Sequence, residues 1–308
     1  MIHKSSLIKG LIGLVFILIS ASSNAQQDPQ YTHYMYNTLS VNPAYAGQRE
    51  TLSVVGLHRT QWVGIDGAPQ TQSLSIHSPL RNERIGLGLN IVNDALGPAR
   101  ETFVDANFSY TIPLNANDLK LSFGVKGGIH MLDTDWSKGL FQNPDVAFQE
   151  NLNLISPMIG AGIYMHTRKW YLGLAVPNFI ETDHYNDFQE SVATERMHFY
   201  FIGGYVFNLS ETTELKPAFL VKGVSGAPLI ADVSANFWFK KKLTAGLAWR
   251  WDDSVSALVG FQVTPGIFVG YSYDMTTTGL NNYNSGTHEI TLRFEVKKLG
   301  RILSPRFF

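Results

Sequence analysis

Apolar and polar residues alternate with a period of two along most of this chain. In 243–252, for example, Leu243, Leu247 and Trp251 share one apolar face with the alanine and tryptophan between them, and the opposite positions are mostly polar or small. Because successive side chains of a strand point to opposite faces, this alternation predicts strands with one apolar and one polar face. No segment of comparable length shows a helical period, so we expect an all-β chain.

The alternating segments predict fourteen strands, most of them nine to thirteen residues long, a length that matches a tilted crossing of a bilayer. The predicted strands are 50–59, 70–78, 84–93, 101–112, 119–131, 156–166, 169–177, 195–207, 213–222, 229–239, 243–251, 254–263, 266–274 and 286–297.

The predicted connections alternate in length. Every second one is short, such as 79–83 and 264–265, whereas 132–155, 178–194 and 275–285 are long and polar. Short turns on one rim and long loops on the other are typical of outer-membrane barrels. An even strand number also puts both barrel ends on the short-turn side. We therefore predict a transmembrane antiparallel up-and-down β-barrel of about 14 strands, and its limits are residues 50–297.

Charge and aromatic residues fit this interpretation. Only 16% of the residues are charged, the net charge is −1 and cysteine is absent, which argues against a disordered chain, a disulfide scaffold and a nucleic-acid binder. The charges on the strands fall on the polar faces, as expected for a lumen lining. Two aromatic belts are predicted at opposite rims, one with Trp249, Trp251, Tyr271 and Tyr273, the other with Tyr110, Trp170, Tyr205, Phe207, Phe237, Phe239 and Phe294.

The two chain ends lie outside the predicted barrel. Lys4 and Lys9, followed by an apolar run and by Ser23 and Ala25, predict a signal peptide over 1–25 that is removed near Ala25, and thus an exported, outer-membrane protein. The aromatic-rich residues 26–49 are interpreted as a periplasmic N-terminal segment. It either plugs the lumen, packs on the periplasmic rim or docks on a partner. Residues 298–308 form a basic periplasmic tail, either solvated or partner-binding.

Signals of catalysis are weak. His288-Glu289 lacks the second histidine of a zinc helix motif, and Asp133-Thr134-Asp135 and Asp252-Asp253 are better explained as solvated loop tips than as cation sites. We therefore expect no catalytic residues, no metal and no cofactor. A passive porin shares every barrel feature and stays an alternative, and so does an outer-membrane lipid hydrolase, which would need a serine–histidine pair.

Several stretches resemble the PorP/SprF family of Bacteroidetes outer-membrane proteins, which is linked to the type IX secretion system and gliding motility. They include Gln-Asp-Pro-Gln-Tyr at 27–31, Asn-Pro-Ala-Tyr-Ala-Gly at 42–47, Arg-Thr-Gln-Trp-Val-Gly-Ile at 59–65, Tyr-Ser-Tyr-Asp at 271–274 and Ser-Pro-Arg-Phe-Phe at 304–308. The resemblance follows the mature chain in order, although 132–200 matches only in pattern.

This resemblance implies a non-enzymatic component of the secretion system. It would bind or anchor a secreted surface protein, such as the C-terminal domain of an adhesin, or periplasmic secretion machinery. We expect the inner rim to contact machinery and the long loops to contact cargo. The expected partner-binding residues are Tyr31, Tyr34, Asn37, Asn42, Pro43, Tyr45, Gly47, Arg59, Gln61, Trp62, Gly67, Pro69, Thr71, Pro305, Arg306 and Phe308.

Overall fold

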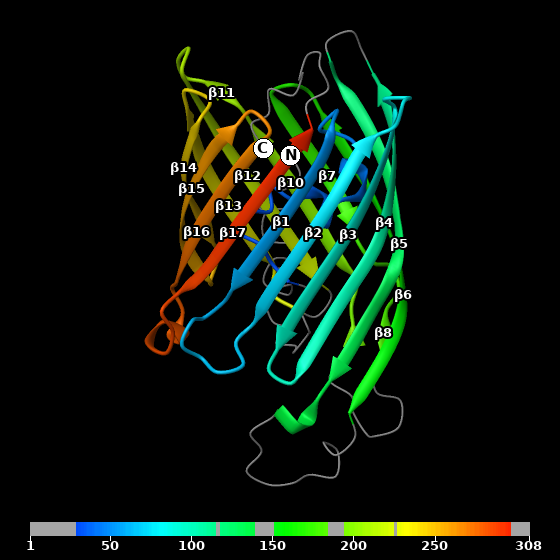
Figure 1. Ribbon diagram of the computed structural model, residues 1–308, viewed down its shortest axis with the longest axis vertical. Helices are drawn as coiled ribbons and strands as arrows, with labels where there is room; N and C mark the ends of the chain where they lie inside the picture. The colour runs from blue at the N-terminus through cyan, green and yellow to red at the C-terminus, as the bar shows by residue number, and fades with distance from the viewer. Residues whose placement is uncertain (1–28, 115–117, 139–150, 184–193, 225–226, 297–308) are drawn as a thin grey trace, which may run out of the picture.

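The computed structural model describes residues 29–114, 118–138, 151–183, 194–224 and 227–296. It is a closed barrel of fourteen antiparallel strands (Figure 1), which confirms the predicted fold. The barrel strands are β1 (Leu52–Thr60), β2 (Gln70–Pro79), β3 (Ile85–Leu96), β4 (Ala99–Pro113), β5 (Lys120–Thr134), β6 (Leu152–His166), β7 (Trp170–Val176), β10 (His198–Tyr205), β12 (Thr213–Val224), β13 (Ile230–Phe239), β14 (Leu243–Arg250), β15 (Ser254–Thr264), β16 (Ile267–Thr276) and β17 (Thr287–Val296).

Neighbours in the sequence pair in space, and two pairings complete the wall. β1 pairs with β17, with Leu52 opposite Val296, and β10 pairs with β12. A two-stranded ribbon, β8 (Thr182–Asp183) and β9 (Thr194–Glu195), stands apart from the barrel sheet.

Most predicted strands differ from the observed ones at their ends, as in β6, which begins at Leu152 and not at 156, and one predicted strand is divided. The pattern over 195–207 predicts a single strand, but this stretch is divided among β9, β10 and β11 (Phe207–Asn208). The gap lies in the pairing with β12, where Pro217 has no N–H to donate, and the register is the same on both sides of it, because Gly204 lies opposite Ala218 and Phe207 lies opposite Leu215. Alternation does not reveal this break, since Val206 is apolar like its neighbours.

The two rims differ as the connection lengths predict. The short-turn rim, at the top of Figure 1, is where β1 begins and β17 ends. The long-loop rim, at the bottom, carries the loops 61–69 and 277–286 and the far end of the β5–β6 hairpin. Short 3₁₀ turns lie in two of its connections, η3 (Trp136–Lys138) and η5 (Gly279–Asn282).

The wall is apolar outside and polar inside. Leu247 is 64% exposed and Leu89 57%, whereas Asp232 and Glu289 on inward faces are at most 1% exposed. A soluble protein has the opposite distribution, with its apolar side chains inside. Lipid around the barrel requires apolar side chains on the outer face of the wall. Within the described ranges, no helix has the length and apolar content needed to cross a bilayer.

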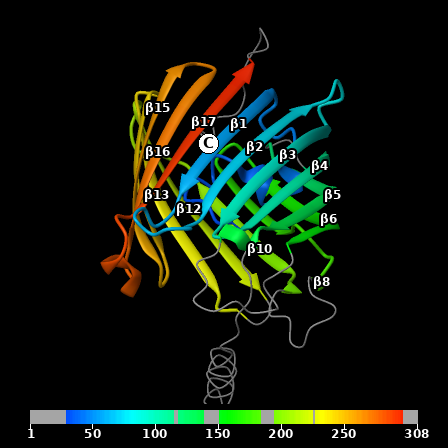
Figure 2. The same cartoon turned by 60° about the horizontal axis from the view of Figure 1, so that its bottom comes forward.

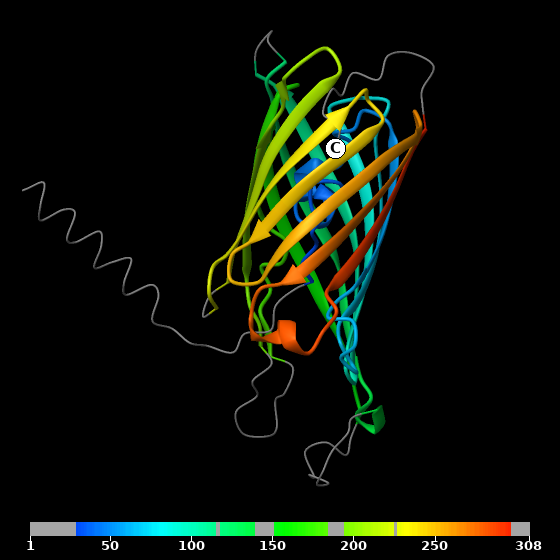
Figure 3. The ribbon, with the colours of Figure 1, turned by 90° about the vertical axis from the view of Figure 1, so that its left-hand side faces the viewer.

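Residues 29–50, which we call the lumen segment, lie inside the barrel. Figures 2 and 3 show this stretch in blue, enclosed by the strands. It contains two 3₁₀ turns, η1 (Thr38–Ser40) and η2 (Pro43–Tyr45), and nearly all of its side chains are buried. Of the three locations that the sequence left open for this segment, the structure shows the lumen. The buried core of the protein therefore lies between the lumen segment and the barrel wall, and not between two sheets.

Candidate functional site in the lumen and at the long-loop rim

The lumen segment is clamped near its start by one carboxylate. Glu289 on β17 accepts from the backbone N–H of Thr32 at 3.0 Å and from that of His33 at 2.7 Å, one through each oxygen. Arg59 on β1 donates to Glu289 at 2.9 Å and to Asp274 on β16 at 2.7 Å. All these groups are buried, so the charges are compensated by one another rather than by water.

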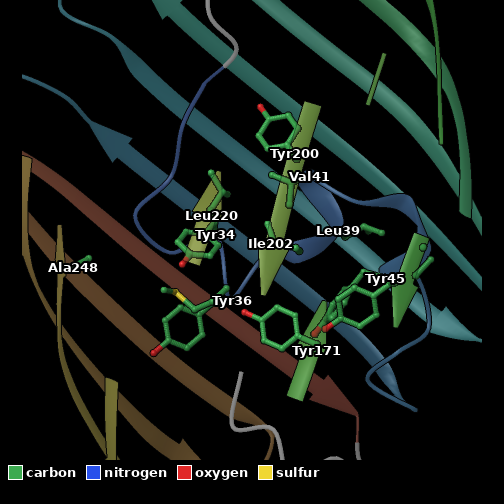
Figure 4. Packing of buried hydrophobic residues seen from close by; sticks show 14 of the residues in the cluster. Tyr34, Tyr36, Leu39, Val41, Tyr45, Tyr171, Tyr200, Ile202, Leu220 and Ala248 are labelled. Atoms are coloured by element: carbon green, nitrogen blue, oxygen red, sulfur yellow. The ribbon is translucent and has the colours of Figure 1, made fainter. Parts of the chain in front are cut away.

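Aromatic rings pack the middle of the segment against the wall. The ring of Tyr36 stacks on Phe268 at 4.8 Å between centroids, and Tyr45 meets Tyr164 edge-on at 5.4 Å. Figure 4 shows Tyr36 and Tyr45 in the same buried cluster as Leu39 and Val41 of the segment and wall residues of β7, β10 and β12. Burial of the rings supplies hydrophobic stabilisation that a solvated tail would not have.

Inward-facing glycines of the wall make room for the segment. A Cβ on Gly124 would lie 2.1 Å from the nitrogen of Ala44, and one on Gly86 would lie 2.1 Å from the carbonyl oxygen of Ala46. At Gly162 it would meet the side-chain oxygen of Asn42 at 2.2 Å. These three glycines on β3, β5 and β6, the glycine cradle, therefore allow a close approach of segment and wall that no other residue would permit.

Polar side chains fasten the last part of the segment near the short-turn rim. Gln48 donates to Thr111 and Ser122 and pairs with His166 at 2.7 Å. Arg49 forms a buried ion pair with Glu295 at 2.6 Å. The lumen segment thus bonds to the wall along its whole length, from the Glu289 clamp to Arg49.

Other charged lumen residues also pair with one another. Arg250 contacts Asp232 at 3.0 Å, and Lys126 contacts Asp105 at 3.4 Å. No group of three or more His, Asp or Glu side chains arranged to hold a metal ion occurs among the residues that the structure describes.

At the long-loop rim, the loop 61–69 bridges its neighbours on both sides. The N–H of Val63 donates to the carbonyl of Gly286, and that of Ser285 donates to the carbonyl of Val63. On the other side, the N–H of Gly97 donates to the carbonyl of Gly67. We call the loops 61–69 and 277–286 together the rim platform. Its exposed apolar side chains include Tyr283, which is 74% exposed, and Leu280, which is 41% exposed.

The structure separates the predicted partner-binding residues into two groups. The seven in the lumen segment are buried, and Arg59 and Thr71 point into the lumen beside them, so these residues hold the plug and do not form an open surface. This burial differs from the two interpretations in which the N-terminal segment packs on the periplasmic rim or docks on a partner. Of the rim residues, Gln61, Trp62 and Gly67 are at least partly exposed, while Pro69 is buried. Pro305, Arg306 and Phe308 lie outside the described residues.

The wall side of the site does not follow from the sequence pattern. Alternation marks Glu289 as an inward charge, but nothing in the chain pairs it with Thr32, 257 residues away. The glycines of the cradle lie in regular strands, where the pattern indicates only close packing. The sequence indicates only that these glycines occupy inward-facing positions of their strands.

Comparison with known families identifies the chain at the level of its family. The family model described as "Type IX secretion system membrane protein PorP/SprF" matches residues 23–294. The chain belongs to the PorP/SprF family. This confirms the resemblance stated from the motifs, and with the barrel fold it fits an outer-membrane location and a role with the secretion machinery.

Solved structures show the same fold in distant proteins. The CymD monoaromatic hydrocarbon channel has a TM-score of 0.51 at 12% identity, over 86% of this chain and 94% of its own. The outer membrane protein Omp33 of Acinetobacter baumannii has a TM-score of 0.44 at 12% identity, over 81% and 100%. At these identities the likeness concerns the barrel fold alone. No curated protein matches the chain.

Proposed function

We propose that this PorP/SprF protein is a plugged, non-enzymatic barrel that holds a secreted surface protein, such as an adhesin, through the C-terminal domain of that protein. Its membrane wall fixes it in the outer membrane, and its rims bind other proteins. The observation that carries the proposal is the lumen segment. A barrel whose interior is filled by its own chain has its rims, and not its lumen, available to bind other proteins.

The contacts of the lumen segment support a sealed barrel. Backbone amides are bound by Glu289, and the glycine cradle leaves the segment in close contact with the wall. A hydrated conduit would need charged groups facing water, but Arg59, Glu289 and Arg49 are nearly fully buried and paired.

The rim platform supports cargo binding on the long-loop side. It presents Tyr283, Leu280 and part of Trp62 on loops that are bonded to one another, so the apolar side chains are held in place before a partner arrives. Exposed aromatic and aliphatic side chains on a preorganised surface are typical of protein-binding sites. The short-turn rim is the face we propose for periplasmic machinery.

Deletion of residues 26–47 tests the proposal. The variant should insert as a barrel, because no wall strand is removed, but it should no longer support display of the secreted partner. Surface display is measured by labelling of intact cells, and insertion by heat-modifiable mobility on a gel. Unchanged display by an inserted variant would refute the role proposed for the lumen segment.

A passive channel is the second candidate, since the fold resembles that of a hydrocarbon channel. Single-channel conductance separates the two. A plugged barrel should be nearly silent in planar bilayers, and the 26–47 deletion should open it. Steady conductance by the intact protein would favour a channel.

A further inference from the structure

The connection between β13 and β14 consists of lysines. Lys240, Lys241 and Lys242 are consecutive, and all three are exposed. The N–H of Lys242 donates to the carbonyl of Phe239 at 2.9 Å, which closes a tight turn at the short-turn rim, at the top in Figure 3. One hairpin tip of this rim therefore carries three positive charges. We call residues 240–242 the lysine turn.

The backbone of the lysine turn does not suit lysine. Its two central residues have positive φ, +47° at Lys240 and +55° at Lys241. Asparagine and glycine are the usual residues in a turn with this requirement, because a left-handed backbone crowds the Cβ of other side chains. Residues that break a local conformational rule in this way are found mostly at functional sites.

The charges of the lysine turn are not neutralised by ion pairs. At the same rim, Lys120 pairs with Glu50 at 2.8 Å and Arg168 pairs with Asp118 at 2.6 Å. Among the residues that the structure describes, no carboxylate forms such a pair with the lysine turn. Its ammonium groups are therefore available to an anion from outside the chain.

Two acidic residues lie on the neighbouring strand and turn. Glu211 belongs to the turn next to the lysine turn, where the carbonyl of Thr212 accepts the N–H of Lys240 at 2.6 Å. Glu214 lies on the lumen face of β12, opposite Trp238, and interacts with Lys241 through its charge without an ion pair. These residues reduce the positive charge of this part of the rim but do not cancel it.

Apolar side chains of the outer wall lie next to the lysine turn. Phe237 and Phe239 on β13 are exposed, and their rings stack at 6.0 Å between centroids. Leu243 on β14 lies opposite Phe239, and Phe261 on β15 lies opposite Leu243. Aromatic side chains at the end of a barrel wall mark the level at which hydrocarbon meets headgroups. Since the lysine turn follows this belt directly along the chain, it lies at the level of the lipid phosphates.

We propose that the lysine turn binds the phosphate of an anionic phospholipid in the periplasmic leaflet of the outer membrane. Lysine clusters beside an apolar membrane surface attract anionic lipids, and an ammonium group donates to phosphate oxygens. The apolar belt next to the turn contacts the acyl chains of the same lipid. A ligand that combines a phosphate with acyl chains matches both surfaces, whereas an acidic protein would match only the lysines. The proposal is independent of the function proposed above.

Native mass spectrometry of the purified full chain tests this proposal. The barrel is released from vesicles that hold equal amounts of phosphatidylglycerol, which is anionic, and phosphatidylcholine, which is zwitterionic, and the retained lipids are counted. The parent protein should retain phosphatidylglycerol preferentially. In the double variant Lys240→Asn with Lys241→Gly, the preference should fall at least about tenfold, because each lysine near an anionic surface strengthens binding roughly fivefold.

The design of this variant separates lipid binding from folding. Asparagine and glycine suit the backbone of the turn better than two lysines, so the variant should resist denaturant at least as well as the parent protein. Lys240→Arg with Lys241→Arg keeps both charges and is the matched control, which should retain the preference. Equal retention of the two lipids by the parent protein would overturn the proposal, and so would an unchanged preference in the variant without the two lysines.

A photo-crosslinking residue at position 242 identifies what the turn contacts in the native outer membrane. We expect crosslinks to phospholipid, and fewer of them when Lys240→Asn and Lys241→Gly are added. Crosslinks mainly to a periplasmic protein would refute the assignment to lipid, since the lysines would then belong to a protein-binding surface.

Discussion

Glu289 shows how one residue fixes the plug. Its two oxygens accept hydrogen bonds from the N–H groups of Thr32 and His33 and from the guanidinium of Arg59. A neutral amide has only one oxygen, so it could accept only some of these hydrogen bonds. We expect Glu289→Gln to lower the free energy of unfolding by about 3–5 kcal/mol, because it leaves a buried guanidinium less compensated. Denaturant unfolding in detergent measures the change. Glu211→Gln, at an exposed position, should shift stability little, and an equal shift in both variants would argue against the clamp.

The glycine cradle permits a test in which the plug keeps its own sequence. Gly124→Ala puts a methyl group 2.1 Å from the backbone nitrogen of Ala44, so the segment has to move. We expect a measurable rise in single-channel conductance. Gly127 lies on the same strand, and a methyl group there would meet no atom within 4 Å, so Gly127→Ala should stay as silent as the parent protein. Conductance that is unchanged in Gly124→Ala would mean that the cradle does not hold the plug closed.

At the scale of elements, the loop 61–69 depends on a glycine. Gly67 has a φ of +73°, and its Cβ would come within 3.2 Å of Gly97. Gly67→Ala should destabilise the loop by about 1–2 kcal/mol, the usual cost of a left-handed non-glycine residue. Faster amide exchange of Gly97, whose N–H donates to Gly67, measures the loosening. In Gly279→Ala, where a methyl group meets nothing within 4 Å, that amide should exchange as before.

The elements also show what the sequence can and cannot predict. Strands such as β13 and β14 follow from alternation, because lipid on one side and a polar lumen on the other impose a strict period of two. The lumen segment has no period, since its two short 3₁₀ turns are held by contacts with distant strands. The cluster of tyrosines at 31–36 indicates that it is buried, but its place in the lumen depends on pairs such as Arg49 with Glu295, which lie at opposite ends of the chain. The inward glycines become interpretable only once that place is known.

At the scale of the whole molecule, the lumen segment runs through the barrel in a defined direction, from the long-loop rim toward the short-turn rim. Its start lies beside Arg59 and Glu289, in the long-loop half, and its end lies at Glu50, which pairs with Lys120 near the short-turn rim. The chain therefore enters the first strand only after passing along the lumen. With long loops facing outward, as in outer-membrane barrels, Gln30 is nearer to the cell surface than to the periplasm.

The absence of cysteine makes this topology measurable, because any introduced thiol is unique in the chain. We expect a small membrane-impermeant thiol reagent to label Gln30→Cys in intact cells, more slowly than Tyr283→Cys on the exposed rim platform, because Gln30 is half-buried inside the mouth. Glu211→Cys, on the opposite rim, should react only after the outer membrane is permeabilised. Combining Gln30→Cys with Glu289→Gln should speed its labelling, since the clamp is what holds the start of the segment. If Gln30→Cys instead reacts only in permeabilised cells, as Glu211→Cys does, the segment approaches the lumen from the periplasm and its direction through the barrel is reversed.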